Sequence, residues 1–442
     1  MLRFAPSPTG DMHIGNLRAA IFNFLMAKKL HQKFIIRIED TDLERNIDNK
    51  DKDILDLLKA FRLSYDDLIY QSDNFPLHRE LAHKLIKEGK AFYCYCSKEF
   101  LESKREEARI QKKAFRYKDE WAELEKGDRQ TSNIIRLHAN KAVRFKDEIK
   151  GEISFSAGEI DSFVIMRNDV PTYNFACSID DKEMSYIIRG EDHISNTPKQ
   201  ILIKEALGFG ANVKYAHLPI ILNDENKKMS KRDAASSVKW LISQGLEPQA
   251  IANYLIIMGN SSVERACGEL FDYNSVIDAF DVANISSNPA HFDYKKMLQI
   301  NRDLLRKKPI ESFYYLLDSI NLNGAKEADF KDLITLYLGE SNSVAELKTH
   351  LENTFNSIES KREMCEFKDE FDKILGILKT DSKNFESYED FKNHLSTSLN
   401  LKGKNLFKPL RILLSGQPHG IEIDKLYNAL KDKMQLIINH HK

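Results

Sequence analysis

Near its start the chain reads Arg3-Phe-Ala-Pro-Ser-Pro-Thr-Gly10-Asp-Met-His13-Ile-Gly15-Asn16, and this stretch decides the fold. A short β-like run at residues 2–5 precedes the prolines, and a helical pattern follows over Ile14–Lys29. A second strand-like run covers Phe34–Ile38. Strand, glycine-containing loop, helix and strand within about 40 residues form a βαβ unit, which predicts a parallel sheet. Ligands of such sheets bind beyond the carboxyl ends of the strands, where this loop lies.

The loop carries residue types that suit a phosphate. Gly10 and Gly15 let the backbone approach a ligand closely. The helix that follows points its N-terminal N–H groups at the loop, which favours an anion there. We therefore expect His13 beside a phosphate. A turn capped by a histidine is the alternative interpretation.

A second candidate is the basic loop Lys227-Lys228-Met229-Ser230-Lys231-Arg232-Asp233, which follows a strand-like run at residues 218–222. Its four cations fall within six residues and suit a triphosphate, because lysines are mobile point charges that can follow a leaving pyrophosphate. A solvated basic loop is the common alternative.

The rest of the chain has a β-rich middle and a helical end. Residues 52–90 predict two amphipathic helices, and the charged residues 97–130 predict a solvated helical face. After about residue 240 the pattern is almost wholly helical, and strand signals are rare until residues 411–414. Further predicted elements are strands at Ile134–Leu137, 143–145, 153–155, 163–166 and Tyr186–Gly190, and a helix at Thr197–Leu207 with Gly208 as its C-cap.

Composition excludes several classes of protein. The 442 residues suggest roughly three domains. The net charge of −1 excludes a uniformly basic protein that coats nucleic acid, although charge can still be segregated on one face. No apolar run reaches the ~18–20 residues needed to cross a bilayer. The N-terminus lacks the form of a signal peptide, and five cysteines argue against a disulfide framework, so we expect a cytoplasmic location.

Taken together, the two loops resemble the signature pair of class I aminoacyl-tRNA synthetases. Three intervening strings narrow the resemblance to bacterial glutamyl-tRNA synthetases: Arg37-Ile-Glu39-Asp40-Thr41-Asp42, Pro171-Thr172-Tyr173-Asn174 and Ile188-Arg189-Gly190-Glu191-Asp192-His193. These motifs span residues 3 to 232. The helical end is a weaker match, carried by Phe407-Lys-Pro-Leu-Arg411.

The resemblance implies an α/β doubly wound (Rossmann-type) catalytic domain with an α+β insertion, followed by all-α C-terminal domains. The expected parts are a catalytic first half (1–92), an acceptor-end-binding insertion (93–185), a catalytic second half with the basic loop (186–240), a helical stem-contact domain (241–305) and a helical anticodon-binding domain (306–442).

The implied reaction is the ATP-dependent ligation of L-glutamate to tRNA through a glutamyl-adenylate, with Mg²⁺ bridging ATP oxygens. The residues that match ATP positions are Pro6, Thr9, Gly10, His13, Gly15, Asn16, Lys228, Met229, Ser230, Lys231 and Arg232, and His13, Lys228 and Lys231 are expected to be catalytic. Those that match the glutamate pocket are Arg3, Ser7, Glu39, Tyr173, Arg189 and His193. A monomer without membrane contact is expected.

The chemistry of glutamate agrees with these positions. A side-chain carboxylate needs a bidentate cation, which Arg3 and Arg189 can supply. The ammonium group needs an acceptor, for which Glu39 is the matching residue. A core tyrosine at Tyr173 and a surface ion-pair partner at Arg189 are the alternatives. The class I pattern often ends in a second histidine where this chain has Asn16, so we give Asn16 no catalytic role.

A zinc site is not expected. Cys94-Tyr-Cys96 resembles the first half of a zinc site that some glutamyl enzymes carry, but residues 97–137 contain neither Cys nor His. A structural zinc needs four such ligands. Residues 115–121 (FRYKDEW), where a second pair would fall, supply none.

Several alternatives remain open. The helical end argues against a glutaminyl-tRNA synthetase, and the length argues against a shorter relative that modifies a tRNA base. A duplicate enzyme that charges the glutamine tRNA with glutamate stays possible on this sequence. A small-molecule nucleotidyltransferase and a non-catalytic tRNA-binding protein derived from a synthetase are the alternatives from other classes.

Overall fold

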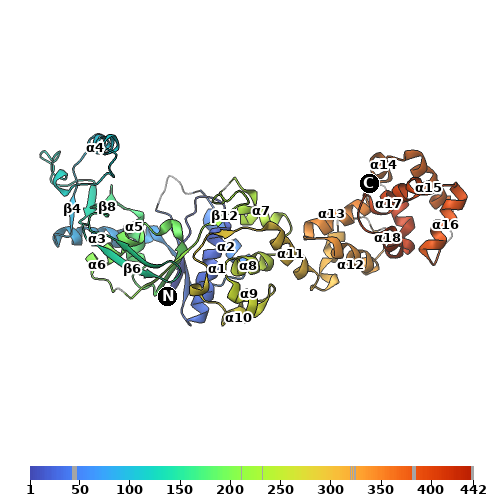
Figure 1. The fold of residues 1–442 in the computed structure, drawn as a ribbon, viewed down its shortest axis with the longest axis horizontal. Coiled ribbons are helices and arrows are strands. Elements are labelled where there is room, and N and C mark those ends of the chain that lie inside the picture. Colours follow the sequence, from blue (N-terminus) through green and yellow to red (C-terminus); the bar gives the residue numbers. More distant parts are fainter. Residues whose placement is uncertain are drawn as a thin grey trace. The chain divides into compact units, whose positions relative to one another are not determined.

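The structure is a computed structural model that describes residues 1–41, 47–210, 212–230, 232–318, 320, 322, 325–380 and 385–439. The chain forms two compact units. The first unit comprises Met1–Trp240 and Ala252–Asp293, and the second comprises Leu241–Ile251 and Tyr294–Lys442. Their helices and strands are labelled in Figure 1.

The predicted βαβ unit is confirmed. Strand β1 (Leu2–Phe4), helix α1 (Ile14–Lys29) and strand β2 (Phe34–Ile38) follow one another, and β1 pairs with β2 in parallel, with Arg3 opposite Ile35. Helix α1 packs on β1, β2 and β10 (Tyr186–Gly190). Its apolar residues are buried because strands and helices cover it on several sides. The loop between β1 and α1 thus lies at the carboxyl end of a parallel strand, as expected.

Residues 52–90 contain one strand that the sequence did not predict. Helices α2 (Lys50–Ala60) and α3 (Phe75–Lys87) are present, but β3 (Asp67–Tyr70) lies between them and pairs in parallel with β2. All four β3 residues are partly or fully exposed. A strand of this kind shows no buried/exposed alternation in its sequence, so pairing with β2 rather than local pattern sets its conformation.

The middle of the chain forms a separate antiparallel sheet and a hairpin. Strands β4 (Ala91–Tyr93), β5 (Ile134–Leu137), β8 (Phe163–Arg167) and β9 (Val170–Pro171) pair in that order. Strands β6 (Val143–Asp147) and β7 (Gly151–Phe155) form the hairpin, and β6 pairs with β11 (Lys214–Leu218) through Asp147 and Tyr215, so that the four strands β10-β11-β6-β7 make a sheet distinct from β1-β2-β3. The hairpin therefore reaches the strands that carry the candidate site.

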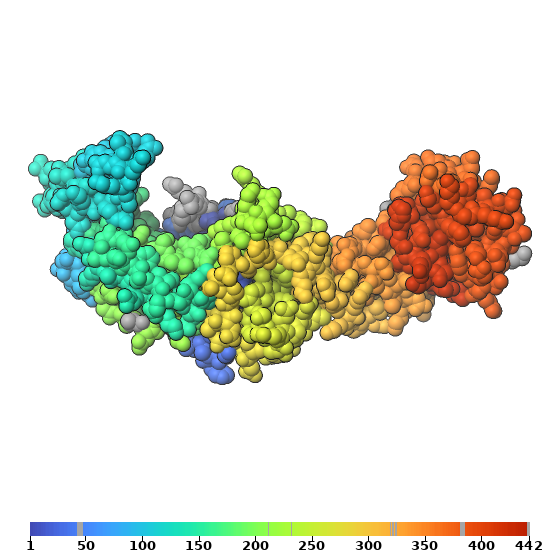
Figure 2. All heavy atoms as spheres, viewed as in Figure 1, coloured from blue at the N-terminus to red at the C-terminus, as the bar shows by residue number. Residues whose placement is uncertain are grey.

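The predicted helical face over residues 97–130 is only partly correct. Helix α4 (Lys98–Ile110) covers only the first part, and the only other helical turn before β5 in the described residues is a short 3-10 helix at Asp119–Trp121. In Figure 2 the atoms of α4 and the loop after it, in cyan, stand out from the rest of the first unit. Few apolar contacts hold this segment, which agrees with its high charge.

A second pair of parallel strands, which belongs to the sheet β10-β11-β6-β7 and not to β1-β2-β3, follows the prediction closely. Strand β10 pairs in parallel with β11, and between them helix α6 runs over Thr197–Leu207, with Gly208 as its left-handed C-cap at φ 71°. Helix α5 (Tyr173–Asp180) packs against α6. The remaining elements of this region are β12 (Ile221–Leu222), β13 (Ala290–His291), α7 (Val238–Ser243), α8 (Pro248–Ile257), α9 (Ser261–Cys267) and α10 (Tyr273–Val276).

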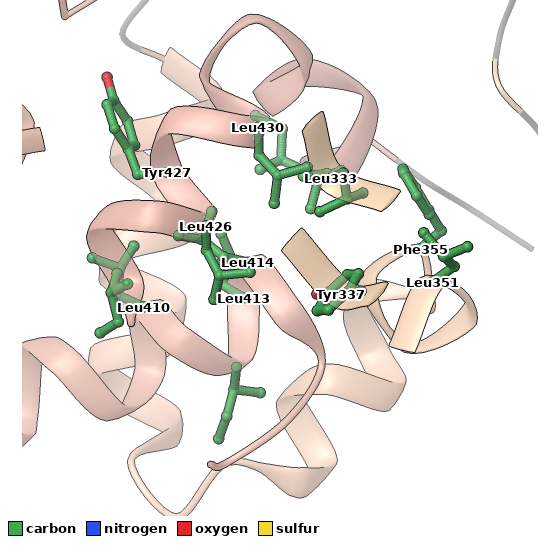
Figure 3. Packing of buried hydrophobic residues seen from close by; sticks show 14 of the residues in the cluster. Leu333, Tyr337, Leu351, Phe355, Leu410, Leu413, Leu414, Leu426, Tyr427 and Leu430 are labelled. Carbon is green, nitrogen blue, oxygen red and sulfur yellow. The ribbon is translucent and has the colours of Figure 1, made fainter. Parts of the chain in front are cut away.

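The second unit is helical throughout its described residues and is built around one apolar core. The strand signal at residues 411–414 is wrong, because these residues lie inside α17. Their branched apolar side chains fit a strand locally, but Leu406, Leu410, Leu413 and Leu414 are all buried at helical spacing. Figure 3 shows Leu410, Leu413 and Leu414 beside side chains of neighbouring helices. The helices are α11 (Tyr294–Leu305), α12 (Lys331–Glu340), α13 (Val344–Thr354), α14 (Ile358–Met364), α15 (Lys368–Thr380), α16 (Tyr388–Leu399), α17 (Lys404–Ser415), α18 (Ile423–Leu430) and α19 (Met434–Ile438).

Across the described residues of both units, every helix is too short or too polar to cross a membrane.

Candidate functional site

A cavity of about 530 Å³ opens in the first unit at the carboxyl ends of β1, β2 and β10. The loop before α1, the end of β2, helix α5 and the segment after β10 all contribute to its wall. Lys228 and Met229 of the basic loop line the same cavity. Two motifs more than 200 residues apart in the sequence therefore meet at one site.

His13 caps helix α1 and also faces the cavity. Its Nδ1 accepts a hydrogen bond of 3.0 Å from the Gly15 N–H, so the proton of the neutral ring lies on Nε2. Nε2 is buried, and no described residue forms a hydrogen bond with it. Burial lowers the pKa of His13, and the nearby Lys228 lowers it further. His13 is therefore a helix cap with a neutral ring that also faces the cavity, while its place beside a phosphate stays a prediction.

The backbone of the basic loop is held at two points, whereas the side chain of Lys228 is exposed. Lys228 forms a β-bridge with Leu222, while its Nζ lies 3.6 Å from Asp192 Oδ2 and the side chain is 59% exposed. The Ser230 N–H donates to Asp233 at 2.8 Å, which closes the turn. This arrangement fixes the backbone of the loop and leaves the ammonium group able to move.

Arg3 is locked in a buried ionic network beneath the cavity. Its Nε and Nη2 donate to the two carboxylate oxygens of Asp181 at 3.0 and 3.2 Å, and Arg37 Nη1 donates to the same carboxylate at 2.6 Å. Burial alone would raise the pKa of Asp181, but the charges of Arg3 and Arg37 hold it well below its usual value. Arg37 also donates to Glu39 Oε1 at 3.1 Å. The network fixes both Arg3 and Glu39 in place.

Arg189 stands at the end of β10 and is only 6% exposed. Its Nη2 donates to Thr197 at 2.7 Å and to Gln200 at 2.8 Å, and its Nε lies 3.3 Å from His217 Nε2. Nη1 is buried, and none of the described residues forms a hydrogen bond with it. A buried cation that lines a cavity and has an unused donor favours an anion at that point.

Tyr173 and His193 form a pair at the same end of the cavity. The Tyr173 hydroxyl lies 3.0 Å from His193 Nδ1. Burial and the charge of Arg189 lower the pKa of His193 to about 4. The imidazole is therefore neutral at pH 7 and contributes an uncharged polar side chain to the cavity wall.

Most of the predicted site residues meet at this cavity. Those that line it are Arg3, Pro6, Ser7, Thr9, His13, Gly15, Asn16, Glu39, Tyr173, Arg189, His193, Lys228 and Met229. Gly10, Ser230 and Arg232 do not line it. Lys231, expected to be catalytic, lies outside the described residues, as does Asp42 of the string that begins at Arg37.

The sequence analysis did not identify the buried residues that hold the cavity-lining side chains in place. Asp181 is the second of two consecutive acidic residues at the end of α5, and nothing in the sequence connects it with Arg3, 178 residues away. Asp147 and His217 carry no motif. Arg18 also lines the cavity, and its Nη2 donates to the Met258 carbonyl at 2.7 Å. An arginine on the apolar face of α1 is the one signal that could have drawn attention to it.

The cysteine pair of the insertion packs among aromatic residues. Cys94 Sγ lies 3.2 Å from the Tyr117 hydroxyl, and Cys96 Sγ donates to the Trp121 carbonyl at 3.0 Å. Both thiols are buried in a small apolar cluster with Leu101 and Tyr117. Nowhere in the described residues do three or more Cys, His, Asp or Glu side chains converge as metal ligands. Two thiols and a phenol do not fit a four-ligand zinc site, and the absence of zinc stays a prediction.

Known proteins are similar to this chain over its whole length. A family model described as tRNA synthetases class I (E and Q), catalytic domain, matches residues 1–299. The chain is 50% identical over 441 residues to a protein of Helicobacter hepaticus named Glutamate--tRNA ligase 2, covering 98% of each. It is 47% identical over 445 residues to Glutamate--tRNA ligase 1 of Nitratiruptor, covering 99% of this chain and 100% of that protein. A crystal structure of a glutamate tRNA ligase from Elizabethkingia meningosepticum, in complex with its amino acid, has the same fold, with a TM-score of 0.79 at 23% identity over 99% of this chain and 98% of that chain.

Proposed function

Because the chain belongs to the class I tRNA synthetases of the E and Q group, we propose that it ligates L-glutamate to tRNA with ATP, through a glutamyl-adenylate. The observation that carries this proposal is the shared cavity. One end presents the buried, unpaired Nη1 of Arg189, and the other end presents the N–H of His13 and the cation of Lys228. A site of this kind fits an amino acid with an acidic side chain beside a nucleotide.

At the amino-acid end, glutamate is held before it reacts. Arg189 and Arg3 stand where two guanidinium groups can receive the side-chain carboxylate, and Glu39 is the acceptor for the ammonium group. Ser7, Tyr173 and His193 complete the wall. Because the arginines are already desolvated and fixed, they bind the carboxylate without reorganisation.

At the nucleotide end, the residues neutralise and position the triphosphate. His13 donates its Nε2–H, Gly15 leaves room for the nucleotide, and Lys228 follows the departing pyrophosphate; Lys231 is proposed to act with it. Pro6, Thr9, Gly10, Asn16, Met229, Ser230 and Arg232 are proposed to shape this end.

The reaction then has two steps. In the first, the glutamate α-carboxylate attacks the α-phosphorus of ATP and pyrophosphate leaves. The nucleophile is already ionised, so positioning and charge neutralisation supply the catalysis without a general base. In the second step, a hydroxyl of the terminal tRNA ribose attacks the adenylate carbonyl and AMP leaves.

Magnesium would be held mainly by the oxygens of ATP. Asp192 is near Lys228 and Glu191 pairs with Lys150, and in the described residues no group of three carboxylate, thiol or imidazole ligands forms a cage. These residues fit a magnesium ion that arrives bound to ATP. When bound, the ion would offset part of the negative charge of the nucleotide.

The proposed tRNA track runs from the insertion (93–185) to the helical parts (241–305 and 306–442). Its candidate phosphate contacts are the lysine clusters at residues 104–113, 295–296, 307–308 and 402–408. Several of these lysines are engaged in ion pairs, such as Lys308 with Glu247 at 2.7 Å and Lys408 with Glu366 at 2.9 Å. Phosphates must replace these partners, so we expect binding to weaken steeply with salt. The monomeric state and the cytoplasmic location remain predictions.

Pyrophosphate exchange into ATP tests the proposal directly. We expect exchange with glutamate in the presence of tRNA, little exchange without tRNA, and none with glutamine. Exchange that needs no tRNA would favour a small-molecule nucleotidyltransferase. Binding of tRNA without any exchange would favour a non-catalytic tRNA-binding protein.

A further inference from the structure

We propose that Asp147 and His217 are positioning residues for glutamate recognition, because together they set the orientation in which Arg189 meets the substrate carboxylate. This inference rests on the proposed function. Neither residue lines the cavity, and both are fully buried. They act through Arg189 and do not touch glutamate.

The carboxylate of Asp147 accepts hydrogen bonds from the β6–β7 hairpin and from His217. It ends strand β6, and its Oδ1 accepts the N–H groups of Ile149 at 3.0 Å and Lys150 at 2.8 Å. Its Oδ2 accepts the backbone N–H of His217 at 3.0 Å and lies 2.6 Å from His217 Nδ1. Burial alone would raise the pKa of Asp147, but its hydrogen bonds with His217 and the hairpin lower it. Asp147 is therefore a carboxylate that can only accept.

The carboxylate fixes the tautomer of His217. Since Asp147 Oδ2 accepts, Nδ1 must carry the proton, and Nε2 of the neutral ring is left as a bare acceptor. Nε2 faces two donors, Arg189 Nε at 3.3 Å and the Thr197 hydroxyl at 2.9 Å. The opposite tautomer would point an N–H at the guanidinium group, and Arg189 would have to turn away.

Three neighbouring side chains accept hydrogen bonds from one edge of the Arg189 guanidinium group, and no described residue pairs with the other edge. His217 accepts from Nε, while Thr197 and Gln200 accept from Nη2 at 2.7 and 2.8 Å. The group is planar, so fixing Nε and Nη2 also fixes Nη1. Nη1 is buried and has no hydrogen-bond partner in the part of the chain that the structure describes, and Arg189 lines the cavity. The geometry thus assigns Nη1 to the substrate carboxylate and makes its direction depend on His217.

The first test is Asp147→Asn, assayed in the full-length chain with glutamate, ATP and tRNA. The amide oxygen can keep the N–H groups of Ile149 and Lys150, but the amide nitrogen then opposes His217 Nδ1–H and drives the proton to Nε2. We expect the KM for glutamate to rise about tenfold to a hundredfold, in line with a lost hydrogen bond to a charged group. The KM for ATP and kcat at saturating glutamate should change less than about threefold, because nothing at the nucleotide end depends on the tautomer.

Two substitutions at His217 separate positioning from simple loss of structure. His217→Gln places an amide oxygen where it can accept from Arg189, while His217→Asn keeps a donor toward Asp147 and loses the acceptor. We expect His217→Gln to retain a glutamate KM nearer that of the wild type than His217→Asn does. His78→Asn is the matched control, since His78 is also fully buried and lies 2.9 Å from Asp180 but does not contact Arg189.

The outcomes are distinct. The inference is overturned if Asp147→Asn leaves the glutamate KM unchanged, if the two His217 variants are equal, or if His78→Asn raises the glutamate KM as much as they do. A wild-type chain that attaches no glutamate to tRNA overturns the proposed function itself. If Asp147→Asn does not fold, the comparison of the two His217 variants still decides.

Discussion

The two ends of the cavity are built differently. At the amino-acid end, Arg3, Arg189 and Glu39 are 4%, 6% and 8% exposed, and each is held by several hydrogen bonds to other buried groups. At the nucleotide end, Lys228 is 59% exposed and its ammonium group has one ion pair, at 3.6 Å. The amino-acid end is therefore buried and held by hydrogen bonds, and we call it the rigid end. The nucleotide end carries an exposed lysine, and we call it the mobile end.

The difference reflects what each end is proposed to do. Selecting one carboxylate requires donors that are fixed and desolvated before the substrate arrives, because only such donors penalise a wrong side chain. A triphosphate changes its geometry as pyrophosphate leaves, so mobile cations can follow the developing charge. Variants at the two ends should therefore fail in different ways.

The largest expected effect is at Arg189. Arg189→Ala removes the buried donor, and we expect the KM for glutamate to rise more than about a hundredfold, as when one partner of a buried charge pair is lost. Arg189→Lys should recover little, because a point charge cannot replace the fixed planar group. Steady-state aminoacylation checks this, and an unchanged glutamate KM in Arg189→Ala would remove this residue from the pocket.

Asp181→Asn should lower the stability of the fold around the rigid end. The substitution leaves the buried charge of Arg3 without its counter-ion and leaves Arg37 with Glu39 alone, which costs about 3–5 kcal/mol in the free energy of unfolding. Urea unfolding followed by tryptophan fluorescence reports this, because both tryptophans, Trp121 and Trp240, belong to the first unit. Glu107→Gln, which breaks the exposed pair with Lys104, is the control and should change little.

His13→Asn should separate catalysis from helix capping. Asparagine is a good N-cap, so α1 should keep its start, but the Nε2 donor is lost. We expect kcat for adenylate formation to fall about a hundredfold, the usual effect of removing one donor to transition-state charge, with the glutamate KM nearly unchanged. A large rise in the glutamate KM with unchanged kcat would show that His13 serves the other end.

Lys228→Ala should have a smaller effect at the mobile end. Neighbouring cations of the same loop can partly replace an exposed lysine, so we expect kcat to fall about tenfold and the KM for ATP to rise modestly. Pyrophosphate exchange measures both. A loss as large as that of Arg189→Ala would mean that the two ends are not built differently.

Acidification should act on the nucleotide end first. His13 and His193 both have a lowered pKa, and that of His193 is about 4. A lowered pKa keeps the ring neutral at pH 7 and permits protonation only as the pH falls below the ordinary value of about 6.5. Because His193 stays neutral until the pH approaches about 4, we expect the glutamate KM to stay constant between about pH 7.5 and 5.5, whereas kcat falls below about pH 6.5 as His13 begins to protonate. A glutamate KM that rises first would reverse the comparison.

Much of the site could be predicted from the sequence because its residues sit in local motifs. The loop before α1, the basic loop and the strand ends at Glu39 and Arg189 are each recognisable from a few neighbouring residues. The support behind them is not: Asp181, Asp147 and His217 act across 178, 70 and 70 positions of sequence through hydrogen bonds that leave no local pattern.

The fold errors have a similar cause. Strand β3 forms because β2 offers it a partner, and its own residues are too exposed to show a pattern. Residues 411–414 show a strand signal because the three apolar residues Ile412, Leu413 and Leu414 fit either element, and only their burial against the helical core decides for α17. Both errors come from tertiary packing that overrides local propensity.

The decisive measurement is side-by-side aminoacylation of purified glutamate- and glutamine-accepting tRNAs with labelled glutamate. We expect ATP-dependent label on at least one of the two tRNAs, and we expect Arg189→Ala to abolish it at low glutamate concentration. If the wild-type chain puts glutamate on neither tRNA, the proposed ligation of glutamate is contradicted.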